Sequence, residues 1–372
     1  MRVSDLGLED FRSYAEVRLA LGRGITALIG SNGAGKTNIL EAIHLAARGD
    51  SPRAHDDTQL VRWGATAGRA RVEVDRAEGH RRIEVVLFSP PAGERRRPRR
   101  YLLDGAGKRA DDVTGELVVV AFFPEDVDLL GAAPNARRRY LDAMLSQIER
   151  AHRRETRELA RVLEQRNALL RAAREEMTLS EDELAFWDRE LVRLSSSVSL
   201  RRAQLVDELA EPFRAATSRF NGASGLDLAY GGQVRGATRE ERSVEYEALL
   251  REKRERERWQ GTTLVGPHRD DLLVTASGRA LPSFASRGEH RSAVLSLKLA
   301  EAAWLTTRVG EPPVFLLDDV LSELDPARRE ALAQAIPSDA QALITAATLT
   351  ALPDVLHDRA TVLPVRRGEV GA

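Results

Sequence analysis

The sequence predicts a mixed α/β fold in which one α/β domain is formed by two separate parts of the chain, with a mostly helical lobe inserted between them. Three stretches of the 372 residues carry this prediction. At 25–43, a strand rich in β-branched residues runs into a glycine-rich loop and then into a helical pattern. At 314–319, an apolar strand ends in two adjacent acids. Between them, from about 136 to 220, apolar residues recur with helical spacing.

The composition narrows the classes of protein to which the chain can belong. Hydrophobic residues make up 42% of the sequence and charged residues 30%, so large cores can form in a soluble protein. No apolar run approaches the ~20 residues of a membrane span, and the start lacks the pattern of a signal peptide. Cysteine is absent, which excludes disulfides, thiol nucleophiles and cysteine-ligated metals. We expect a cytoplasmic protein with no membrane partner.

The first half of the predicted site is the loop "GSNGAGKT" at 30–37. Its glycines, Lys36 and Thr37 match the phosphate-binding loop, and the match lies between a strand and a helix, as that loop requires. Lys36 would reach the β and γ phosphate oxygens, and Thr37 would hold Mg²⁺. The expected nucleotide contacts are Gly30, Ser31, Asn32, Gly33, Ala34, Gly35, Lys36 and Thr37. The alternative is an ordinary glycine turn.

A second glycine–lysine stretch, "DGAGKRA" at 104–110, is different. It lacks the first glycine and the Ser or Thr of the motif. Short strand-like segments flank it, so we predict a hairpin turn there.

The second half of the site is "VFLLDDVLSELD" at 314–325. Two adjacent carboxylates at the end of an apolar strand repel each other unless a cation or a reacting water lies between them. Asp318 would hold Mg²⁺, and Asp319 would orient or deprotonate the attacking water as a catalytic residue. The alternative is a strand that ends in a polar turn. Most of the chain separates Lys36 from Asp318, so a large insertion is expected.

A third element, "SRGEHR" at 286–291, opens a predicted helix. Exposed amides at Ser286 and Gly288 would form a second anion site, although this segment alone is more typical of an ordinary helix cap. The order of phosphate loop, helix start, Asp-Asp strand and "LSELD" resembles the head of ABC ATPases. In such heads this helix faces the γ-phosphate of ATP bound to a second subunit. The resemblance implies that Ser286 and Gly288 act in trans.

A narrower resemblance covers nearly the whole chain. Its motifs are "LEDFRSY" (8–14), "GSNGAGKTNILEAI", "FFPEDVDLL" (122–130), "GAAPNARRRYLD" (131–142), "TLVGPHRDDL" (263–272), "SRGEHR" and "LLDDVLSELD". Together they resemble the RecF family of recombination mediators. The resemblance implies an ABC-type P-loop ATPase head with an inserted helical lobe, similar to SMC heads without the long coiled coil. Arg12, in the first motif, is a further expected nucleotide contact.

The resemblance also implies a function. Members of this family bind ATP with Mg²⁺, dimerise on ATP, and act as slow, DNA-stimulated ATPase switches in recombinational gap repair and the SOS response. They work with RecO and RecR to load RecA. The expected DNA partners are double-stranded DNA and gapped or single-strand/double-strand junction DNA.

Two departures from the ABC pattern favour a slow switch. Asp319 is shorter than the Glu of most ABC ATPases, and "ALITAATLT" offers only Thr345, Thr348 and Thr350 where transporters place a histidine. A glutamine switch loop is not evident, and Phe123–Asp126 is the expected place for it.

The helical lobe is predicted at 131–258, between head halves at 1–130 and 259–372. Its apolar seam consists of Leu184, Trp187, Leu191, Leu194, Val198 and Leu205. With an earlier helix, this seam predicts a hairpin with arms of roughly 25–40 residues. Ser180 and Glu183 form a capping box for the seam helix. Such a seam is more typical of core packing than of partner binding.

Two arginine-rich stretches are candidate DNA contacts. "ERRRPRRY" (94–101) and "RRRY" (137–140) combine guanidiniums with aromatic residues, which suits phosphate binding. The expected contacts are Arg95, Arg96, Arg97, Arg99, Arg100, Arg137, Arg138 and Arg139. A solvated face is the alternative for any one cluster, and the family resemblance favours DNA.

Two other functional classes remain possible at this stage. An ABC transporter ATPase shares the main motifs, but transporters place the signature helix much closer to the phosphate loop. A structural head of the SMC type would carry a far longer coil than the predicted hairpin.

Overall fold

The computed structural model describes residues 1–89, 99–176, 181–220, 225–276, 279–280 and 287–371. The chain divides into two compact units. Unit 1 comprises Met1–Asp128, Pro212–Ser224 and Ser286–Ala372, and unit 2 comprises Leu129–Glu211 and Gly225–Ala285. Unit 2 therefore extends to 285 rather than to the expected 258, because the strands at 271–276 and 279–280 form one sheet with the strand at 226–231. Pro212–Ser224, which was expected in the lobe, belongs to unit 1.

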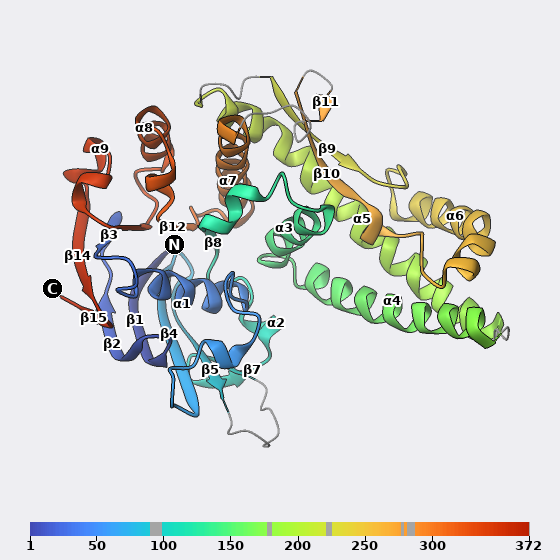
Figure 1. Cartoon of the computed structure of the whole chain (residues 1–372), viewed down its shortest axis with the longest axis horizontal. Helices are drawn as coiled ribbons and strands as arrows, with labels where there is room; N and C mark the ends of the chain where they lie inside the picture. Colours follow the sequence, from blue (N-terminus) through green and yellow to red (C-terminus); the bar gives the residue numbers. More distant parts are fainter. Residues whose placement is uncertain (90–98, 177–180, 221–224, 277–278, 281–286, 372) are drawn as a thin grey trace. The chain divides into compact units, whose positions relative to one another are not determined.

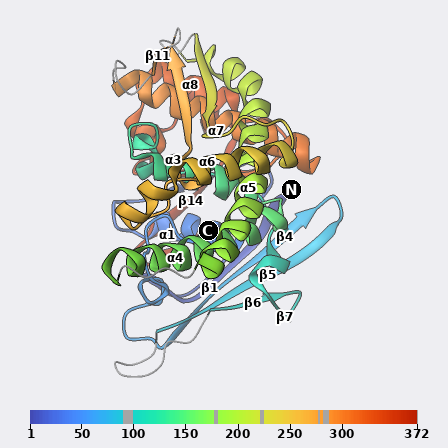
Figure 2. The ribbon, with the colours of Figure 1, turned by 90° about the vertical axis from the view of Figure 1, so that its right-hand side faces the viewer.

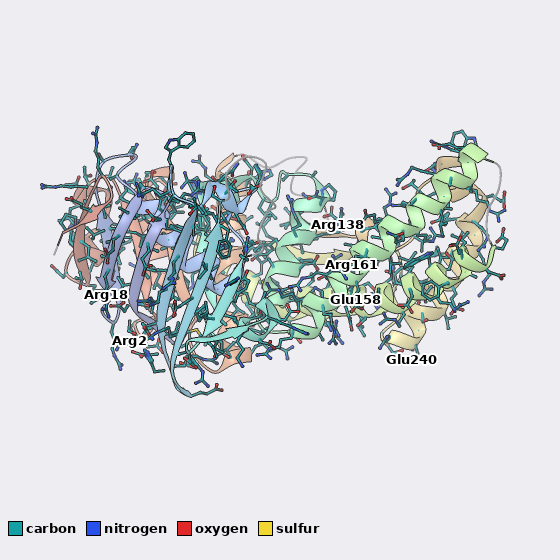
Figure 3. All side chains as sticks on the ribbon, turned by 90° about the horizontal axis from the view of Figure 1, so that it is seen from below. Arg2, Arg18, Arg138, Glu158, Arg161 and Glu240 are labelled. Carbon is teal, nitrogen blue, oxygen red and sulfur yellow. The ribbon has the colours of Figure 1, made fainter. Side chains whose placement is uncertain are left out.

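One sheet of unit 1 is antiparallel, with six strands in the order β2-β1-β4-β5-β6-β7. Its strands are β1 (Arg2–Phe11), β2 (Tyr14–Ala20), β4 (Ala67–Arg76), β5 (Gly79–Phe88), β6 (Arg100–Leu103) and β7 (Ala106–Lys108). Figure 2 shows β4 to β7 side by side. Alternation places residues such as Leu6 and Leu8 in the core, while Arg18 is exposed (Figure 3).

The other sheet of unit 1 has the order β15-β14-β3-β13-β12-β8 and is parallel except for the terminal hairpin. Its strands are β3 (Ile25–Ile29), β8 (Val119–Phe122), β12 (Val314–Asp318), β13 (Ala342–Ala346), β14 (Ala360–Arg366) and β15 (Glu369–Val370). The central strands are continuous apolar runs because both faces of a parallel sheet are covered. The carboxyl ends of β3, β13 and β12 meet at one edge, where polar residues follow each strand.

Helix α1 (Lys36–Arg48) packs against strands of both sheets (Figure 1). Its apolar residues Ile39, Leu40 and Ile43 are fully buried in the unit 1 core. The other helical segments of unit 1 are η1 (Asp57–Gln59), α2 (Ala110–Val113), η2 (Pro124–Asp128), α7 (Arg287–Val309), η5 (Val320–Glu323), α8 (Pro326–Ala335), η6 (Leu349–Ala351) and α9 (Asp354–His357).

The predicted hairpin at 104–110 is confirmed. Strands β6 and β7 pair in antiparallel fashion across Asp104 and Gly105, which have φ values of 52° and 81°. Two successive residues with positive φ are the turn that matches the twist of paired strands. An Asp–Gly sequence adopts this turn readily, so the stretch forms a sheet edge and not a phosphate loop.

Unit 2 consists of long helices and a small three-stranded sheet. Its elements are α3 (Pro134–Ser146), α4 (Arg150–Glu176), most of α5 (Glu181–Thr217), β9 (Leu226–Gly231), α6 (Arg239–Gln260), η3 (Pro267–Arg269), β10 (Asp271–Ala276) and β11 (Arg279–Ala280). The 27 residues of α4 and 37 of α5 confirm the predicted arm lengths. Ser180, the predicted cap of α5, lies outside the described residues.

The predicted seam of α5 is part of the protein interior. Leu184, Leu191, Leu194, Val198 and Leu205 are buried, and Trp187 packs partly buried against the same core. This confirms the core-packing interpretation. None of the helices formed by the described residues combines the length and the apolarity that crossing a bilayer requires.

Candidate nucleotide site

The loop after β3 has the backbone geometry that phosphate binding requires. At Gly30, a Cβ atom would lie 2.2 Å from the carbonyl oxygen of Val365. Gly35 has φ 111° and is the N-cap of α1, and no side chain caps that helix. The first-turn amides of α1 are therefore available for an anion, and the helix dipole favours negative charge there. Ser31, Asn32 and Gly33 are exposed at the tip of the loop, as expected for residues that meet a ligand.

The ammonium group of Lys36 is the positive charge of the loop. Its Nζ donates hydrogen bonds to the carbonyl oxygens of Gly30 (2.6 Å) and Ser31 (3.0 Å). Burial lowers the pKa of the Lys36 ammonium, and the negative charges of Asp319 and Asp318 partly oppose that shift. The ammonium thus lies close to both acids that the sequence predicted to share its site.

Asp318 meets Thr37 as predicted. The Thr37 hydroxyl donates to Asp318 Oδ1 at 2.9 Å, and the Thr345 hydroxyl donates to the same oxygen at 2.8 Å. Burial raises the pKa of the Asp318 carboxyl, while the hydrogen bonds from Thr345 and Thr37 and the charge of Arg53 act against that rise. Parallel pairing of β12 with β13 brings Thr345 to this point, since Asp318 is in register with it.

Asp319 has an unusual backbone conformation. Its φ of 49° and ψ of 17° are left-handed, a region that glycine adopts freely and that Asp and Asn adopt more readily than other residues with a Cβ atom. The Asp319 N–H donates to the Thr345 hydroxyl at 2.8 Å, and the Asp319 carbonyl accepts from the Ser322 hydroxyl, also at 2.8 Å. Among the described residues, none donates a hydrogen bond to the Asp319 carboxylate. This acid is therefore held by its backbone while its carboxylate stays available.

The donor set fits a magnesium nucleotide. Loop amides and an ammonium bind phosphate oxygens, while hydroxyl and carboxylate oxygens suit a hard divalent cation. No group of three or more His, Asp or Glu side chains within the described ranges could hold a metal alone. A Thr37–Asp318 site would instead complete its shell with phosphate oxygens and water, as Mg²⁺ usually does.

Arg12 is committed to other partners. Its guanidinium donates to both carboxylate oxygens of Glu41, which is fully buried, and to the carbonyl oxygen of Gln59. These bonds brace α1, on which Glu41 lies, against the chain after β1. Its expected role as a nucleotide contact stays a prediction, and the geometry gives Arg12 a structural role.

Helix α7, which begins in "SRGEHR" and corresponds to the signature helix of ABC heads, is described from Arg287 onward. Ser286 therefore lies outside the described residues. At Gly288, a Cβ would lie 3.2 Å from a terminal nitrogen of Arg328. Arg328 also donates to the Ser292 hydroxyl at 2.8 Å and pairs with Asp325, the last residue of "LSELD". The "LSELD" stretch therefore braces the start of α7 within one chain. The trans roles of Ser286 and Gly288 stay predictions.

The segment expected to hold the switch loop is tied to α7. Asp126 Oδ2 accepts a hydrogen bond from the Phe123 N–H at 2.9 Å and lies 3.3 Å from Lys298 Nζ on α7. The segment forms part of η2 and carries no glutamine. Its connection to α7 includes the ion pair between Asp126 and Lys298.

Three residues near the site were not among the sequence-based site predictions. Thr345 binds both acids, the charge of Arg53 acts on Asp318, and the Tyr14 hydroxyl donates to the carbonyl oxygen of Gly35 at 3.1 Å. A hydroxyl residue ending the strand beside the acidic strand could have indicated Thr345. Nothing local in the sequence connects Arg53 or Tyr14 to the loop, because their proximity depends on strand pairing.

The first arginine cluster is only partly described, since Arg95, Arg96 and Arg97 lie outside the described residues. Arg99 is held by Asp57, the Gly49 carbonyl and the Tyr101 hydroxyl, whereas Arg100 is exposed and lies over the Phe88 ring. A groove of about 800 Å³ lies here on the antiparallel sheet. It is lined by Arg69, Val86, Phe88, Arg99, Arg100, Tyr101, Leu102, Gly107, Lys108, Arg109 and Asp112. Its cations far outnumber its one acid.

The second arginine cluster is mostly structural. Arg137 is buried and donates to both carboxylate oxygens of Asp271 and to the carbonyl oxygens of Leu130 and Ala132. Arg138, labelled in Figure 3, is half-buried and donates to the Asp270 carbonyl at 2.7 Å. Arg139 is exposed. Only Arg139 of this cluster therefore presents a guanidinium to solvent without a protein partner among the described residues.

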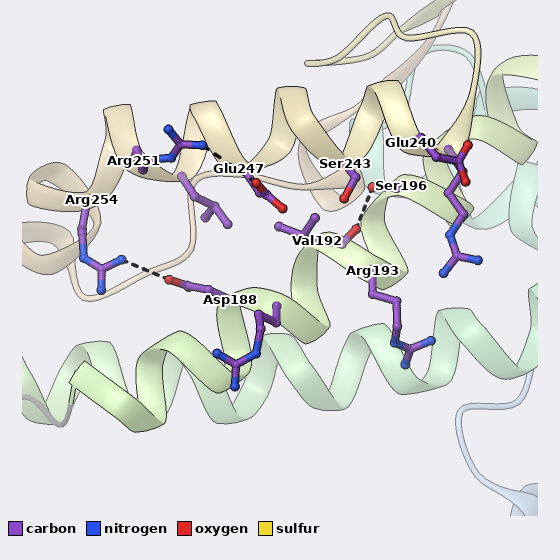
Figure 4. Close-up of a pocket in the computed structure, with 12 residues that line it drawn as sticks. Asp188, Val192, Arg193, Ser196, Glu240, Ser243, Glu247, Arg251 and Arg254 are labelled. Carbon is purple, nitrogen blue, oxygen red and sulfur yellow. Dashed lines mark hydrogen bonds and ion pairs between the residues drawn. The ribbon is translucent and has the colours of Figure 1, made fainter.

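A groove of about 410 Å³ in unit 2 has different chemistry (Figure 4). It lies between α5 and α6, and Val192 and Leu250 are among its lining residues. Arg254 pairs with Asp188 at 3.1 Å, and Arg251 lies 3.8 Å from Glu247. Half of its charged side chains are paired with one another, and no glycine loop lines this groove within the described residues to present backbone amides as the loop site does.

Comparisons with known proteins identify the family of the chain. The family model for the RecF/RecN/SMC N-terminal domain matches residues 2–367. The chain is 41% identical over 372 residues to the DNA replication and repair protein RecF of Roseiflexus castenholzii, with 94% of each chain covered. It is 36% identical to RecF of Gloeobacter violaceus, with 100% of this chain and 99% of that relative covered.

A solved structure of the recombination mediator protein RecF-ATPrS in the RecFOR pathway superposes with a TM-score of 0.89 at 26% identity, covering 99% of this chain and 97% of that chain. A Smc head matches with a TM-score of 0.55 at 15% identity, which supports the fold alone. The chain therefore belongs to the RecF family of DNA replication and repair proteins, a family of ABC-type ATPases.

Proposed function

We propose that this chain is a cytoplasmic, ATP-dependent DNA-binding protein of recombinational repair that dimerises on ATP and hydrolyses it slowly. Family membership supports the role in repair. The observation that carries the ATP-dependent part is the meeting of Thr37 and Asp318 beside the uncapped start of α1, with Lys36 at the same point. Two solved RecF structures that resemble this chain are RecF-ATPrS and RecF-ATP.

In this proposal each site residue has a separate task. The loop amides at 30–37 and Lys36 bind the phosphate oxygens of ATP. Thr37 and Asp318 hold Mg²⁺, which when bound neutralises charge on the phosphates. Asp319 accepts a hydrogen bond or a proton from the attacking water. Its short side chain favours slow hydrolysis, so the protein acts as a DNA-stimulated switch rather than a motor.

The proposed partners follow from the family. We expect double-stranded DNA and gapped or junction DNA to bind unit 1 through the groove that contains Arg100, and RecO and RecR to act with the ATP-bound dimer. Exposed cations over a sheet with two aromatic side chains support phosphate contact there. Arg139 is the residue of the second cluster whose exposure suits the same role.

Sedimentation with and without ATP and duplex DNA tests the proposal. The sedimentation coefficient of the wild-type chain should rise on addition of ATP and rise further with DNA. Lys36→Met should bind ATP roughly 10- to 100-fold more weakly, because a charge-assisted hydrogen bond to phosphate is lost, and should not dimerise. A Lys36→Met variant that still dimerises with ATP would refute the assignment of the loop.

A mixture of two inactive variants tests whether the signature helix works in trans. Ser286→Arg should bind ATP but fail to dimerise, because a bulky cation enters the interface. A heterodimer of Lys36→Met and Ser286→Arg carries both lesions at one shared site and none at the other. We expect some ATP-dependent association to return in the mixture. If it shows no more association than either variant alone, the proposed composite site is wrong or needs both halves intact.

A further inference from the structure

Thr345 lies at the point where two chemically important strands end. It belongs to β13, is 1% exposed, and is paired in register with Asp318 on one side and Leu28 on the other. Lys36 and Thr37 follow the loop after β3, so β13 separates the phosphate-loop strand from the acidic strand. A hydroxyl at this position is within reach of groups from both.

A single hydroxyl makes two directed hydrogen bonds here. Thr345 Oγ1 accepts from the Asp319 N–H at 2.8 Å and donates its proton to Asp318 Oδ1, also at 2.8 Å. A hydroxyl has one proton and two lone pairs, so the two directions are compatible. The hydroxyl proton is donated to the side chain of Asp318, and a hydroxyl lone pair accepts the backbone N–H of Asp319.

One bond fixes the orientation of the Asp318 carboxylate, and the other stabilises the left-handed backbone of Asp319. Asp318 Oδ1 also accepts from Thr37, and within the described part of the chain no group donates to Oδ2. The carboxylate is therefore held by one oxygen while the other remains available. At Asp319 the left-handed backbone is unfavourable for a residue with a Cβ. The bond from its N–H to Thr345 offsets part of that strain and sets the direction of the side chain.

We propose that Thr345 is a positioning residue for the acid pair: its hydroxyl orients Asp318 for the magnesium site and turns Asp319 toward the attacking water. The inference rests on the proposed function and adds a residue and a role to it. Thr345 acts through the two acids and does not touch the reacting atoms.

Thr345→Val tests this role with little change in volume, because it removes the hydroxyl and keeps the branched shape. We expect the Mg²⁺ concentration needed for half-maximal ATP binding to rise about tenfold, since two hydrogen bonds to the acids are lost. The turnover number for hydrolysis should fall by a similar factor or more, while ATP binding at saturating Mg²⁺ changes less than twofold. Thr345→Ser keeps the hydroxyl and should restore both properties.

Thr26→Val is the matched control. Thr26 is 2% exposed on β3 in the same sheet, near the amino end of that strand, and its hydroxyl makes no hydrogen bond to the described residues. It should leave the Mg²⁺ requirement unchanged. Thr345→Ala, which leaves room for a water molecule, is the second variant should Thr345→Val fail to fold, and its Mg²⁺ requirement should shift in the same direction.

Two outcomes are decisive and separable. If the variants without the hydroxyl bind ATP with the Mg²⁺ requirement of wild type, or if Thr345→Ser is as impaired as Thr345→Val, the positioning role is overturned. If Lys36→Met binds ATP as wild type does, the proposed function itself fails, and this result is independent of Thr345.

Discussion

Each unit contains a pair of adjacent aspartates at one end of a strand, and the carboxylates of the two pairs have different hydrogen-bond partners. Asp318 is the last residue of strand β12 in unit 1 and Asp319 follows it, whereas Asp271 is the first residue of strand β10 in unit 2 and Asp270 precedes it. In sequence each pair is simply "DD" next to apolar residues. The difference lies in what the carboxylate oxygens contact.

The pair in unit 2 is saturated by the protein. Asp270 accepts from the Tyr230 hydroxyl at 2.6 Å and from the Gln233 N–H at 3.1 Å. Asp271 accepts from two nitrogens of Arg137 at 2.8 and 2.7 Å. All four oxygens have donors, and a guanidinium compensates the charge. Such a pair connects α3 to the small sheet and has a protein donor on every carboxylate oxygen.

The pair in unit 1 is left incomplete. Neutral hydroxyls meet one oxygen of Asp318, and the nearby cation, Lys36, is bonded to loop carbonyls instead. Repulsion between the adjacent acids is relieved by a guanidinium in unit 2, whereas in unit 1 we propose that Mg²⁺ relieves it. Unsatisfied oxygens, more than the presence of two acids, distinguish a binding site from a structural tie.

The largest expected effect is on hydrolysis. Asp319→Asn preserves shape but cannot accept a proton from water, so the rate of phosphate release should fall by about 10²- to 10⁴-fold. The free energy of unfolding should stay near that of wild type, and the ATP-bound dimer should accumulate in sedimentation. Hydrolysis within twofold of wild type would remove Asp319 from the catalytic role and make the two acid pairs alike.

The corresponding change in unit 2 should affect stability. Asp271→Asn leaves the buried Arg137 guanidinium without its anion, which should lower the free energy of unfolding by about 3 kcal/mol. Urea denaturation measures this directly. Arg139→Ala on the same helix is the control and should change stability by less than about 0.5 kcal/mol. Equal losses in both variants would contradict the structural role of the Arg137–Asp271 pair.

Arginines can be compared in the same way. The guanidinium of Arg137 is bonded to protein groups, whereas the side chain of Arg100 is exposed. Changing Arg100, Lys108 and Arg109 together to Ala should weaken DNA binding and reduce the slope of log affinity against log salt by about 2 to 3. Titration of labelled duplex DNA at several salt concentrations measures the slope. Arg18→Ala, an exposed change on the same sheet, should leave it unchanged. A normal slope in the triple variant means that the groove is a solvated face.

The smallest expected effect concerns a third arrangement, in which the buried Glu73 and the partly exposed Asp75 both contact His80. His80 Nδ1 contacts Asp75 at 2.8 Å and Nε2 contacts Glu73 at 2.7 Å. These hydrogen bonds raise the pKa of His80 and, by the same contact, lower that of Asp75. The histidine contribution is therefore complete below its unfolded pKa, near 6.5, and disappears as pH rises through the folded value.

Unfolding free energies between about pH 5.5 and 8.5 test this. His80→Gln should remove a pH-dependent contribution of less than about 0.5 kcal/mol, because the group is exposed and screened. Stability that rises through this range for wild type relative to His80→Gln has the wrong sign for the proposed contacts.

Much of the head was predictable from the sequence because it depends on local backbone rules. The loop at 30–37 needs glycines at defined positions, the turn at Asp104–Gly105 needs positive φ, and long apolar seams indicate helices. The nucleotide site could be placed at Lys36 and Asp318 for the same reason, since each motif includes its own strand and loop. Parallel strands then bring the motifs to one edge.

Only the tertiary structure decided which polar groups are already satisfied. Arg137 and Arg139 are neighbours in one cluster, yet one binds Asp271, 134 positions away, and the other faces solvent. Arg12 donates to Glu41, and Thr345 joins the acid pair because β13 pairs in register with β12. The sequence shows how many hydrogen bonds each side chain can donate or accept. It does not show which partners meet that side chain, because many of these partners are distant in the sequence.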